Sequence, residues 1–226
     1  MRLVQILMLT LLVGCTQLYG ALEPKKESLR SDEVNQAFKV IKMSREASVM
    51  LVSYGLSGEE YYGSGAYVVH NGHYFILTAA HVVSDLDKTY VLSKNNFTRL
   101  KVVYIDREGD IALLSVGNLN GRVPIPYETA VPEVGTEIYY TGNPHLIQDL
   151  TFSGMVSGKR KNKIIINSYA WKGSSGSVVL DPDGKIVGVV SSILLGLDYE
   201  NRPQLSEDVA IVASIQTVNI DSLSSQ

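Results

Sequence analysis

Along most of this chain, hydrophobic and polar residues alternate in short runs rich in β-branched and aromatic residues. Glycine, proline and small polar residues bound these runs from about residue 49 onward. A period of two predicts β-strands, and many short strands with little helix between them favour a barrel or a sandwich. The predicted strands cover residues 49–54, 66–69, 89–92, 100–105, 111–116, 137–141, 150–157, 163–168, 177–180, 186–192 and 209–213.

Turn signals divide the strands into two groups. The run 68–77 contains Asn-Gly at positions 71 and 72, the pair that tolerates the positive φ angles of a tight hairpin turn. Prolines at 124, 126 and 132 mark a linker, which places the boundary between two halves within 117–134. The first half is expected to cover about 46–120 and the second about 130–218.

A different pattern precedes the strands. Val34, Ala37, Phe38 and Ile41 recur at helical spacing, and Ser31 is suited to cap a short amphipathic helix that ends before residue 47. Residues 22–30 are rich in charge and contain a proline, and the segment 15–30 is predicted to be a tether between the N-terminus and a domain that spans 31–226.

The first residues are typical of a secretory signal. Residues 3–13 are apolar apart from two polar positions, and this run is too short to span a bilayer. It ends in Leu12-Val13-Gly14-Cys15, which resembles the bacterial lipobox, so we expect a signal peptide at 1–14 and a lipid on Cys15. The alternative is an ordinary signal cleaved near Gly20-Ala21. Lipidation would anchor the exported protein to the cell envelope, on the outer membrane or the periplasmic face.

Composition narrows the classes of function. The chain has 226 residues, 45% of them hydrophobic and 19% charged, and a net charge of −3, so it can bury a core but has no electrostatic footprint for nucleic acid. The one basic cluster, Lys159–Lys163, lies between two apolar runs and is predicted to be a hairpin turn. Cys15 is the only cysteine, which excludes a disulfide within the monomer. The sequence gives no indication of the oligomeric state.

Three residues suggest covalent chemistry by their types and order. Ser175 lies in the glycine-rich run 173–177, and His81 and Asp110 precede it. A serine hydroxyl becomes a strong nucleophile when a histidine takes its proton and a carboxylate holds that histidine in the required tautomer. Gly173 would let the backbone turn tightly so that two amides converge, and Gly176 would leave room for a substrate chain.

Other residues compete for these roles. Asp106 is the rival carboxylate for His81, and Ser174 and Ser177 are rival nucleophiles, but the spacing favours Asp110 and Ser175. The Gly-x-Ser-x-Gly pattern of α/β-hydrolases is not met, because Ser177 occupies the place of its second glycine.

Several segments together resemble the chymotrypsin-like (trypsin-like) serine proteases, and among them the HtrA/Deg-type bacterial branch. The resemblance implies an all-β fold of two six-stranded antiparallel barrels, here with a short N-terminal helix, and hydrolysis of peptide bonds in protein substrates through an acyl-enzyme. It covers about residues 43–218. The matching segments are Gly63–Val69, Leu77–Val83, Asp110–Leu114, Gly173–Gly176, Asp183–Ser191 and Val209–Ile215.

The same resemblance implies roles for individual residues. Ser175 would attack the substrate, His81 would act as base and then acid, and Asp110 would orient His81. The oxyanion hole would comprise residues 173–175, with Ser174 between the amides of Gly173 and Ser175. The backbone of Ser191 would pair with the substrate as an added strand. Residues expected to line the pocket for the side chain before the scissile bond are Tyr169, Ala170, Ser192 and Ile193.

No acidic residue occupies the position of Tyr169, so cleavage after lysine or arginine is not expected. No cofactor and no metal are expected either. His70 and His73 flank the Asn-Gly turn and could share a metal, but the polarity of the turn accounts for them.

Two departures from the family pattern suggest an alternative function. Ser174 stands where the family usually has Asp or Asn, and Ser177 replaces a usual glycine. The alternative is a membrane-tethered binding module that keeps the protease fold but is catalytically impaired.

Overall fold

The computed structural model describes residues 23–83, 88–93, 96–197 and 199–223. The chain divides into two compact units, Met1–Lys39 and Val40–Gln226. The predicted signal peptide, Cys15 and the first half of the predicted tether, up to residue 22, lie outside the described residues.

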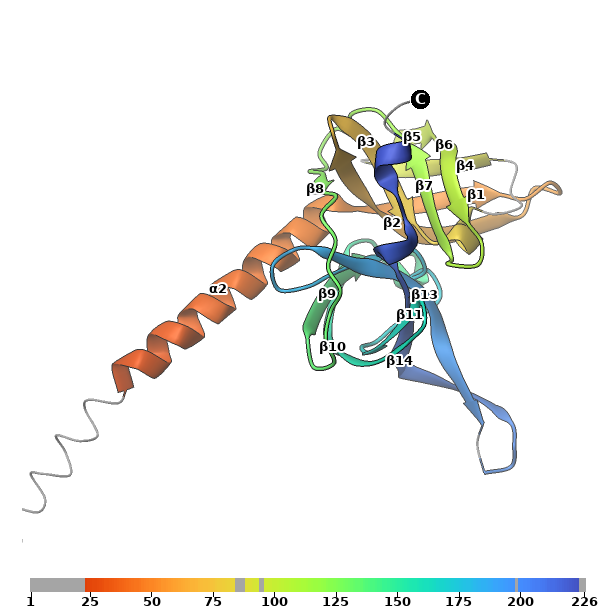
Figure 1. Ribbon diagram of the computed structural model, residues 1–226. Coiled ribbons are helices and arrows are strands. Elements are labelled where there is room, and N and C mark those ends of the chain that lie inside the picture. The colour runs from red at the N-terminus through yellow and green to blue at the C-terminus, as the bar shows by residue number, and fades with distance from the viewer. Residues whose placement is uncertain (1–22, 84–87, 94–95, 198, 224–226) are drawn as a thin grey trace, which may run out of the picture. The chain divides into compact units, whose positions relative to one another are not determined.

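The N-terminal helix is longer than the sequence indicated. Helix α2 runs Glu23–Ala47, so the prediction that it begins after a cap at Ser31 is wrong, and the predicted tether is helical from Glu23 (Figure 1). Pro24 falls in the first turn, where a missing N–H costs nothing, and the charged residues that follow are good helix formers. No helix in the described ranges is long and apolar enough to cross a membrane.

The second half forms a closed antiparallel barrel, as predicted. Its six strands follow the order β10-β11-β14-β13-β12-β9 around the ring. A core of fully buried side chains fills it, including Ile138, Tyr140 and Ile166. The strands are β9 (Glu137–Gly142), β10 (Leu150–Arg160), β11 (Lys163–Asn167), β12 (Val178–Leu180), β13 (Ile186–Leu197) and β14 (Pro203–Ser214).

The first half is built from eight strands in the order β5-β4-β1-β2-β3-β7-β6, with β8 beside β2. Leu100 alone separates β5 from β6, so the two behave as one strand that bends at Leu100 and pairs with β4 on one side and β7 on the other. With β5 and β6 counted as one strand and the two-residue β8 left out, six strands follow one another in this half, as expected. The strands are β1 (Ser48–Tyr54), β2 (Glu60–His70), β3 (His73–Thr78), β4 (Lys88–Ser93), β5 (Asn96–Arg99), β6 (Lys101–Asp106), β7 (Ile111–Ser115) and β8 (Ile125–Pro126).

Three local features refine the prediction. The Asn71-Gly72 turn joins β2 to β3 with φ of 48° and 79°, as the sequence indicated. The linker between the barrels contains β8, which pairs with β2 in parallel rather than antiparallel. Strands β13 and β14 continue past the barrel as a two-stranded arm, with Leu197 paired to Pro203 (Figure 1).

Candidate active site

His81 and Asp110 lie side by side because of the strands that precede and follow them. His81 follows β3 in a short 3₁₀-helix, Ala80–Val82, and Asp110 immediately precedes β7. Since β3 and β7 pair, with Thr78 opposite Ala112, the two side chains meet at the same end of the sheet. Nδ1 of His81 lies 3.0 Å from each carboxylate oxygen of Asp110, and the backbone N–H of His81 donates to Oδ1 at 3.0 Å.

The carboxylate of Asp110 receives one more hydrogen bond. The hydroxyl of Ser191 donates to Oδ2 at 2.5 Å. The sequence pattern predicted a role only for the backbone of Ser191, so this side-chain contact was not expected. Burial raises the pKa of Asp110, but hydrogen bonds from the His81 ring, the Ser191 hydroxyl and the His81 amide together hold that pKa below its ordinary value. Asp110 therefore stays ionised beside the imidazole.

Asp106, the rival carboxylate, has a different position. Its Oδ1 accepts a hydrogen bond from the backbone N–H of Gly109 at 2.8 Å, within the turn that leads into Asp110. Asp110 itself has a φ of 62°, a left-handed conformation that costs a non-glycine residue about 1–2 kcal/mol. The turn thus holds Asp110 in a conformation that suits its contacts with His81.

The loop that carries Ser175 is fastened to the first barrel. The N–H of Ser64, in β2, donates to the carbonyl of Ser175 at 2.8 Å. A Cβ on Gly176 would lie 2.0 Å from the carbonyl oxygen of Ser64 and 2.2 Å from Oγ1 of Thr78, and φ of Gly176 is 88°. The absence of a side chain at Gly176 therefore allows the loop to pack closely against β2 and β3, rather than leaving room for a substrate chain.

The amides expected to bind an oxyanion are available. Gly173 has a φ of 97°, and neither its N–H nor that of Ser175 donates a hydrogen bond to another residue in the described part of the chain. Nor do the described contacts include a hydrogen bond between Ser175 and His81. Catalytic hydrogen bonds often form only once substrate is bound.

The two serines that depart from the family pattern, Ser174 and Ser177, both fit within the loop that carries Ser175. Ser174 is buried, and its hydroxyl accepts a hydrogen bond from the N–H of Trp171 at 3.2 Å. Ser177 is also buried, and its Oγ faces Gly142, where an added Cβ would lie only 2.1 Å away. Its hydroxyl has no hydrogen-bond partner within the described ranges. Because residue 142 is a glycine, there is room for the side chain of Ser177.

A cavity of about 300 Å³ opens beside Ser175. Four of the five residues predicted to bind substrate line it, namely Ala170, Ser191, Ser192 and Ile193. Tyr169 does not line it: its ring packs on that of Phe152, with centroids 5.4 Å apart. The other lining residues are Trp171, Lys172, Val190 and Leu205, the last of which comes from the β13–β14 arm.

A second cavity, of about 240 Å³, is lined by Gly173. Trp171 and Lys172 contribute to both cavities. The rings of His145 and Trp171 stack in this second cavity with centroids 5.4 Å apart, so His145 is a loop residue near the predicted site.

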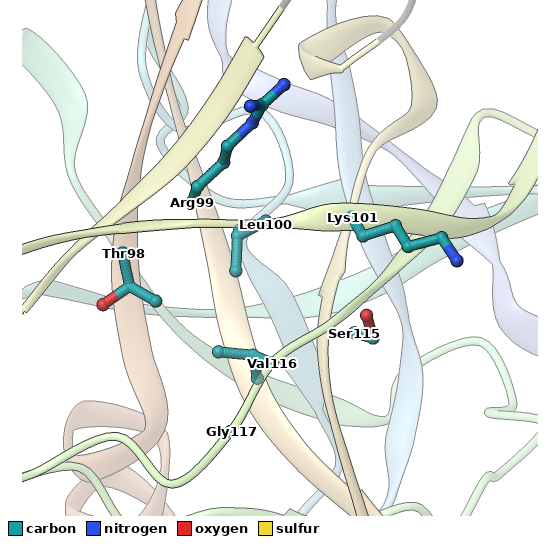
Figure 2. Close-up of a pocket in the computed structure, with 7 residues that line it drawn as sticks. All are labelled: Thr98, Arg99, Leu100, Lys101, Ser115, Val116 and Gly117. Carbon is teal, nitrogen blue, oxygen red and sulfur yellow. The ribbon is translucent and has the colours of Figure 1, made fainter.

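The largest of the described cavities, about 490 Å³, shares no residue with either of these (Figure 2). It lies on the first barrel around Leu100 and Val116. Figure 2 shows the charged ends of Arg99 and Lys101 pointing in different directions, so they do not converge on one ligand.

The metal site that His70 and His73 could share has no support from neighbouring ligands. No group of three or more His, Cys, Asp or Glu side chains in the described ranges is arranged to hold a metal ion. Nε2 of His70 lies 2.6 Å from a carboxylate oxygen of Asp221.

Known proteins share this fold and sequence pattern. A probable DegP-like periplasmic serine endoprotease of Chlamydia pneumoniae is 28% identical over 154 residues, which are 62% of this chain and 30% of that protein. A probable do/HhoA-like periplasmic serine protease of Haemophilus influenzae is 26% identical over 176 residues, 72% of this chain and 38% of that protein. The chain thus spans about a third of the length of these curated relatives, which confirm its resemblance to the HtrA/Deg branch.

Solved structures agree on the fold. A protease from M. tuberculosis in its active form has a TM-score of 0.64 at 17% identity, covering 82% of both chains. A serine endoprotease from Yersinia pestis has a TM-score of 0.63 at 21% identity, covering 80% of this chain and 62% of that one. The predicted chymotrypsin-like double barrel is confirmed.

The model of the trypsin-like peptidase domain matches residues 63–189, which include the His81 segment, the Asp110 segment and the loop of Ser175. This match covers more than half of the chain, and the chain therefore belongs to the trypsin-like peptidase domain family.

Proposed function

We propose that this protein is a serine endopeptidase that cleaves protein substrates through an acyl-enzyme. The observation that carries the proposal is the carboxylate of Asp110, which contacts Nδ1 of His81 and leaves Nε2 as the nitrogen that can accept a proton. Ser175 lines the adjoining cavity together with Ser191, which donates to the same carboxylate.

Each step of the reaction has a residue to perform it. Oγ of Ser175 attacks the scissile carbonyl carbon while its proton moves to Nε2 of His81. The amides of Gly173 and Ser175 stabilise the oxyanion that forms. His81 gives the proton to the leaving amine as the peptide bond breaks. Water then attacks the acyl-enzyme, His81 takes its proton, and the carboxylate product leaves as Ser175 regains a hydrogen.

The cavity beside Ser175 suggests the kind of residue that precedes the scissile bond. Ala170, Val190, Ile193 and Leu205 give it an apolar lining, and none of the described residues that line it is acidic. A small or medium aliphatic side chain fits this surface. The backbone of Ser191, in β13, would pair with the substrate on that side.

A fluorophosphonate probe tests the proposed activity because it reacts only with an activated serine. The full chain is expected to be labelled at Ser175, and the Ser175→Ala variant to remain unlabelled while keeping the wild-type melting temperature. Peptide mapping of the labelled protein identifies the modified serine. Well-folded wild-type protein that takes up no probe would contradict the proposal and would favour the binding module with an impaired site.

We also propose that the exported protein carries a lipid on Cys15, since its relatives are periplasmic and an unpaired cysteine follows a signal-like segment. Expression with labelled palmitate is expected to yield a labelled protein in the membrane fraction. The Cys15→Ser variant removes the only thiol of the chain and should lose the label completely. Incorporation that survives this change would exclude the anchor.

A further inference from the structure

The loop between β9 and β10, residues 143–149, is held in an unfavourable backbone conformation. His145, Leu146 and Asp149 have φ of 53°, 64° and 57°. Each left-handed non-glycine residue costs about 1–2 kcal/mol. The loop therefore depends on contacts with its surroundings to keep this shape.

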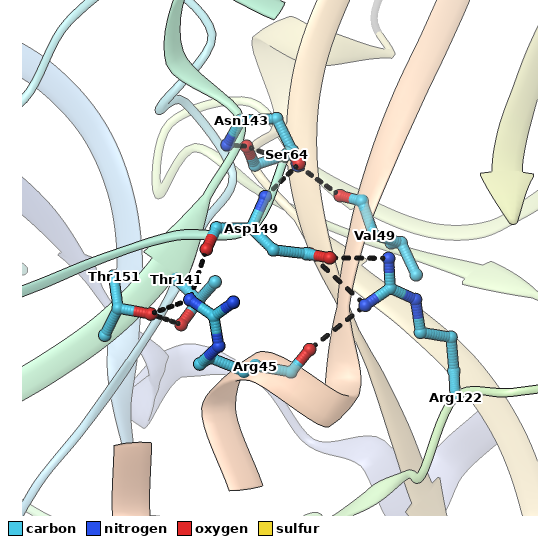
Figure 3. A network of polar contacts seen from close by, with 8 residues as sticks. All are labelled: Arg45, Val49, Ser64, Arg122, Thr141, Asn143, Asp149 and Thr151. Atoms are coloured by element: carbon cyan, nitrogen blue, oxygen red, sulfur yellow. Dashed lines mark hydrogen bonds and ion pairs between the residues drawn. The ribbon is translucent and has the colours of Figure 1, made fainter. Parts of the chain in front are cut away.

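Two arginines hold the far end of the loop. The guanidinium of Arg122 donates to both carboxylate oxygens of Asp149 at 3.2 Å, and both side chains are largely buried, with 14% and 26% exposed (Figure 3). Arg45, at the end of α2, donates to the carbonyl of Asp149 at 2.6 Å, and Arg122 also donates to the carbonyl of Arg45 at 3.0 Å. A bidentate, partly buried pair of this kind fixes geometry better than a surface ion pair does.

The near end of the loop is fixed through Asn143, which is buried between the barrels. The N–H of Asp149 donates to Oδ1 of Asn143 at 3.1 Å, so the two ends of the loop are joined. Asn143 in turn donates from Nδ2 to the carbonyl of Val49 at 2.9 Å and from its backbone N–H to Oγ of Ser64 at 2.9 Å (Figure 3). Through these contacts the loop is tied to β1 and β2 of the first barrel.

The fixed loop contacts the peptide that carries one of the oxyanion amides. The N–H of His145 donates to the carbonyl of Lys172 at 3.0 Å. This carbonyl belongs to the same trans peptide as the N–H of Gly173, so the contact turns that N–H to the opposite side, away from the loop. Oγ of Ser64 donates to the carbonyl of Gly173 at 2.6 Å, which fixes the next peptide.

We propose that Arg122 and Asp149 are positioning residues that keep the oxyanion hole formed by holding loop 143–149 against the peptide of Gly173. The inference rests on the proposed peptidase function.

Steady-state kinetics of the full chain on a peptide p-nitroanilide with valine before the scissile bond test the proposal. Loss of one oxyanion donor lowers kcat by about 100-fold or more. Arg122→Ala and the shape-preserving Asp149→Asn are therefore each expected to lower kcat by about that factor, with KM changed by less than about twofold, and Arg122→Lys should be intermediate. The matched control is Glu133→Gln, which removes another ion pair of the second barrel, to Lys159 at 3.2 Å, and should change neither constant.

A suppressor separates positioning from a general loss of stability. Glycine adopts left-handed φ without cost, so Leu146→Gly in the Arg122→Ala background should let the loop keep its shape and recover kcat by about tenfold. Folded Arg122→Ala and Asp149→Asn proteins with wild-type kcat, or a loss that Leu146→Gly does not reduce, would overturn the proposal. Failure of the proposed function would be distinguishable, because the wild-type chain itself would then neither hydrolyse the anilide nor react with fluorophosphonate.

Discussion

Replacing Ser175 with alanine is expected to lower kcat on a peptide substrate by about 10⁶-fold while leaving the fold intact. The methyl group offers no nucleophile, whereas the loop is held by backbone contacts that alanine keeps, such as the bond from the N–H of Ser64 to the carbonyl of residue 175. Single-turnover kinetics measure the residual rate.

A second variant, His81→Ala, tests whether Ser175 and His81 act as one unit. If His81 acts only by activating Ser175, then His81→Ala costs about as much as Ser175→Ala, and the double variant is no slower than either. Ser177→Ala is the matched control because it removes a nearby hydroxyl that is buried against Gly142 and has no partner in the described part of the chain. Full activity of the Ser175→Ala protein, or additive losses in the double variant, would contradict the proposed mechanism.

Most of the fold could be predicted from short-range sequence patterns. Alternating residues located nearly all strands of the barrels, and Asn71-Gly72 specified its hairpin. The sequence did not indicate where β13 and β14 would continue past the barrel, because their pairing beyond Ile193 depends on each other rather than on a buried face. The start of α2 was missed because a proline in a charged segment is compatible with both a tether and a first helical turn.

The candidate active site was likewise predictable only in part from the sequence. The order of His81, Asp110 and Ser175, together with the resemblance of their segments to the trypsin-like proteases, predicted that His81 and Asp110 act together, and the two side chains do contact each other. The hydroxyl of Ser191 on Asp110 and the side chain of Leu205 in the cavity depend on how distant strands come together. Tyr169 was expected in that cavity, but its ring packs on Phe152 instead. Tertiary contacts of this kind leave no pattern in a single sequence.

The change Asp110→Asn is expected to lower kcat by about 10⁴-fold while preserving the shape of the site. An amide can donate to Nδ1 of His81, which would leave the proton on Nε2 and remove the base that Ser175 requires. Asp106→Asn is the matched control, because the side chain of Asp106 accepts from Gly109 and an amide oxygen can do the same. Steady-state kinetics at neutral pH measure both variants, and equal losses in the two would contradict the role of Asp110.

The same substitution has a predictable effect on stability, because the pKa of Asp110 is lowered in the folded protein. A lowered pKa means that the ionised carboxylate stabilises the fold above the carboxyl's unfolded pKa, and that this stabilisation is lost as pH falls through the folded pKa. Urea unfolding should therefore show Asp110→Asn to be less stable than the wild type at pH 7, with the difference shrinking as the pH is lowered below the ordinary carboxyl range. A difference that stays constant from neutral to acidic pH would mean that the hydrogen bonds from His81 and Ser191 do not favour the charged form. In that case Asp110 could not hold the imidazolium that the acylation step creates.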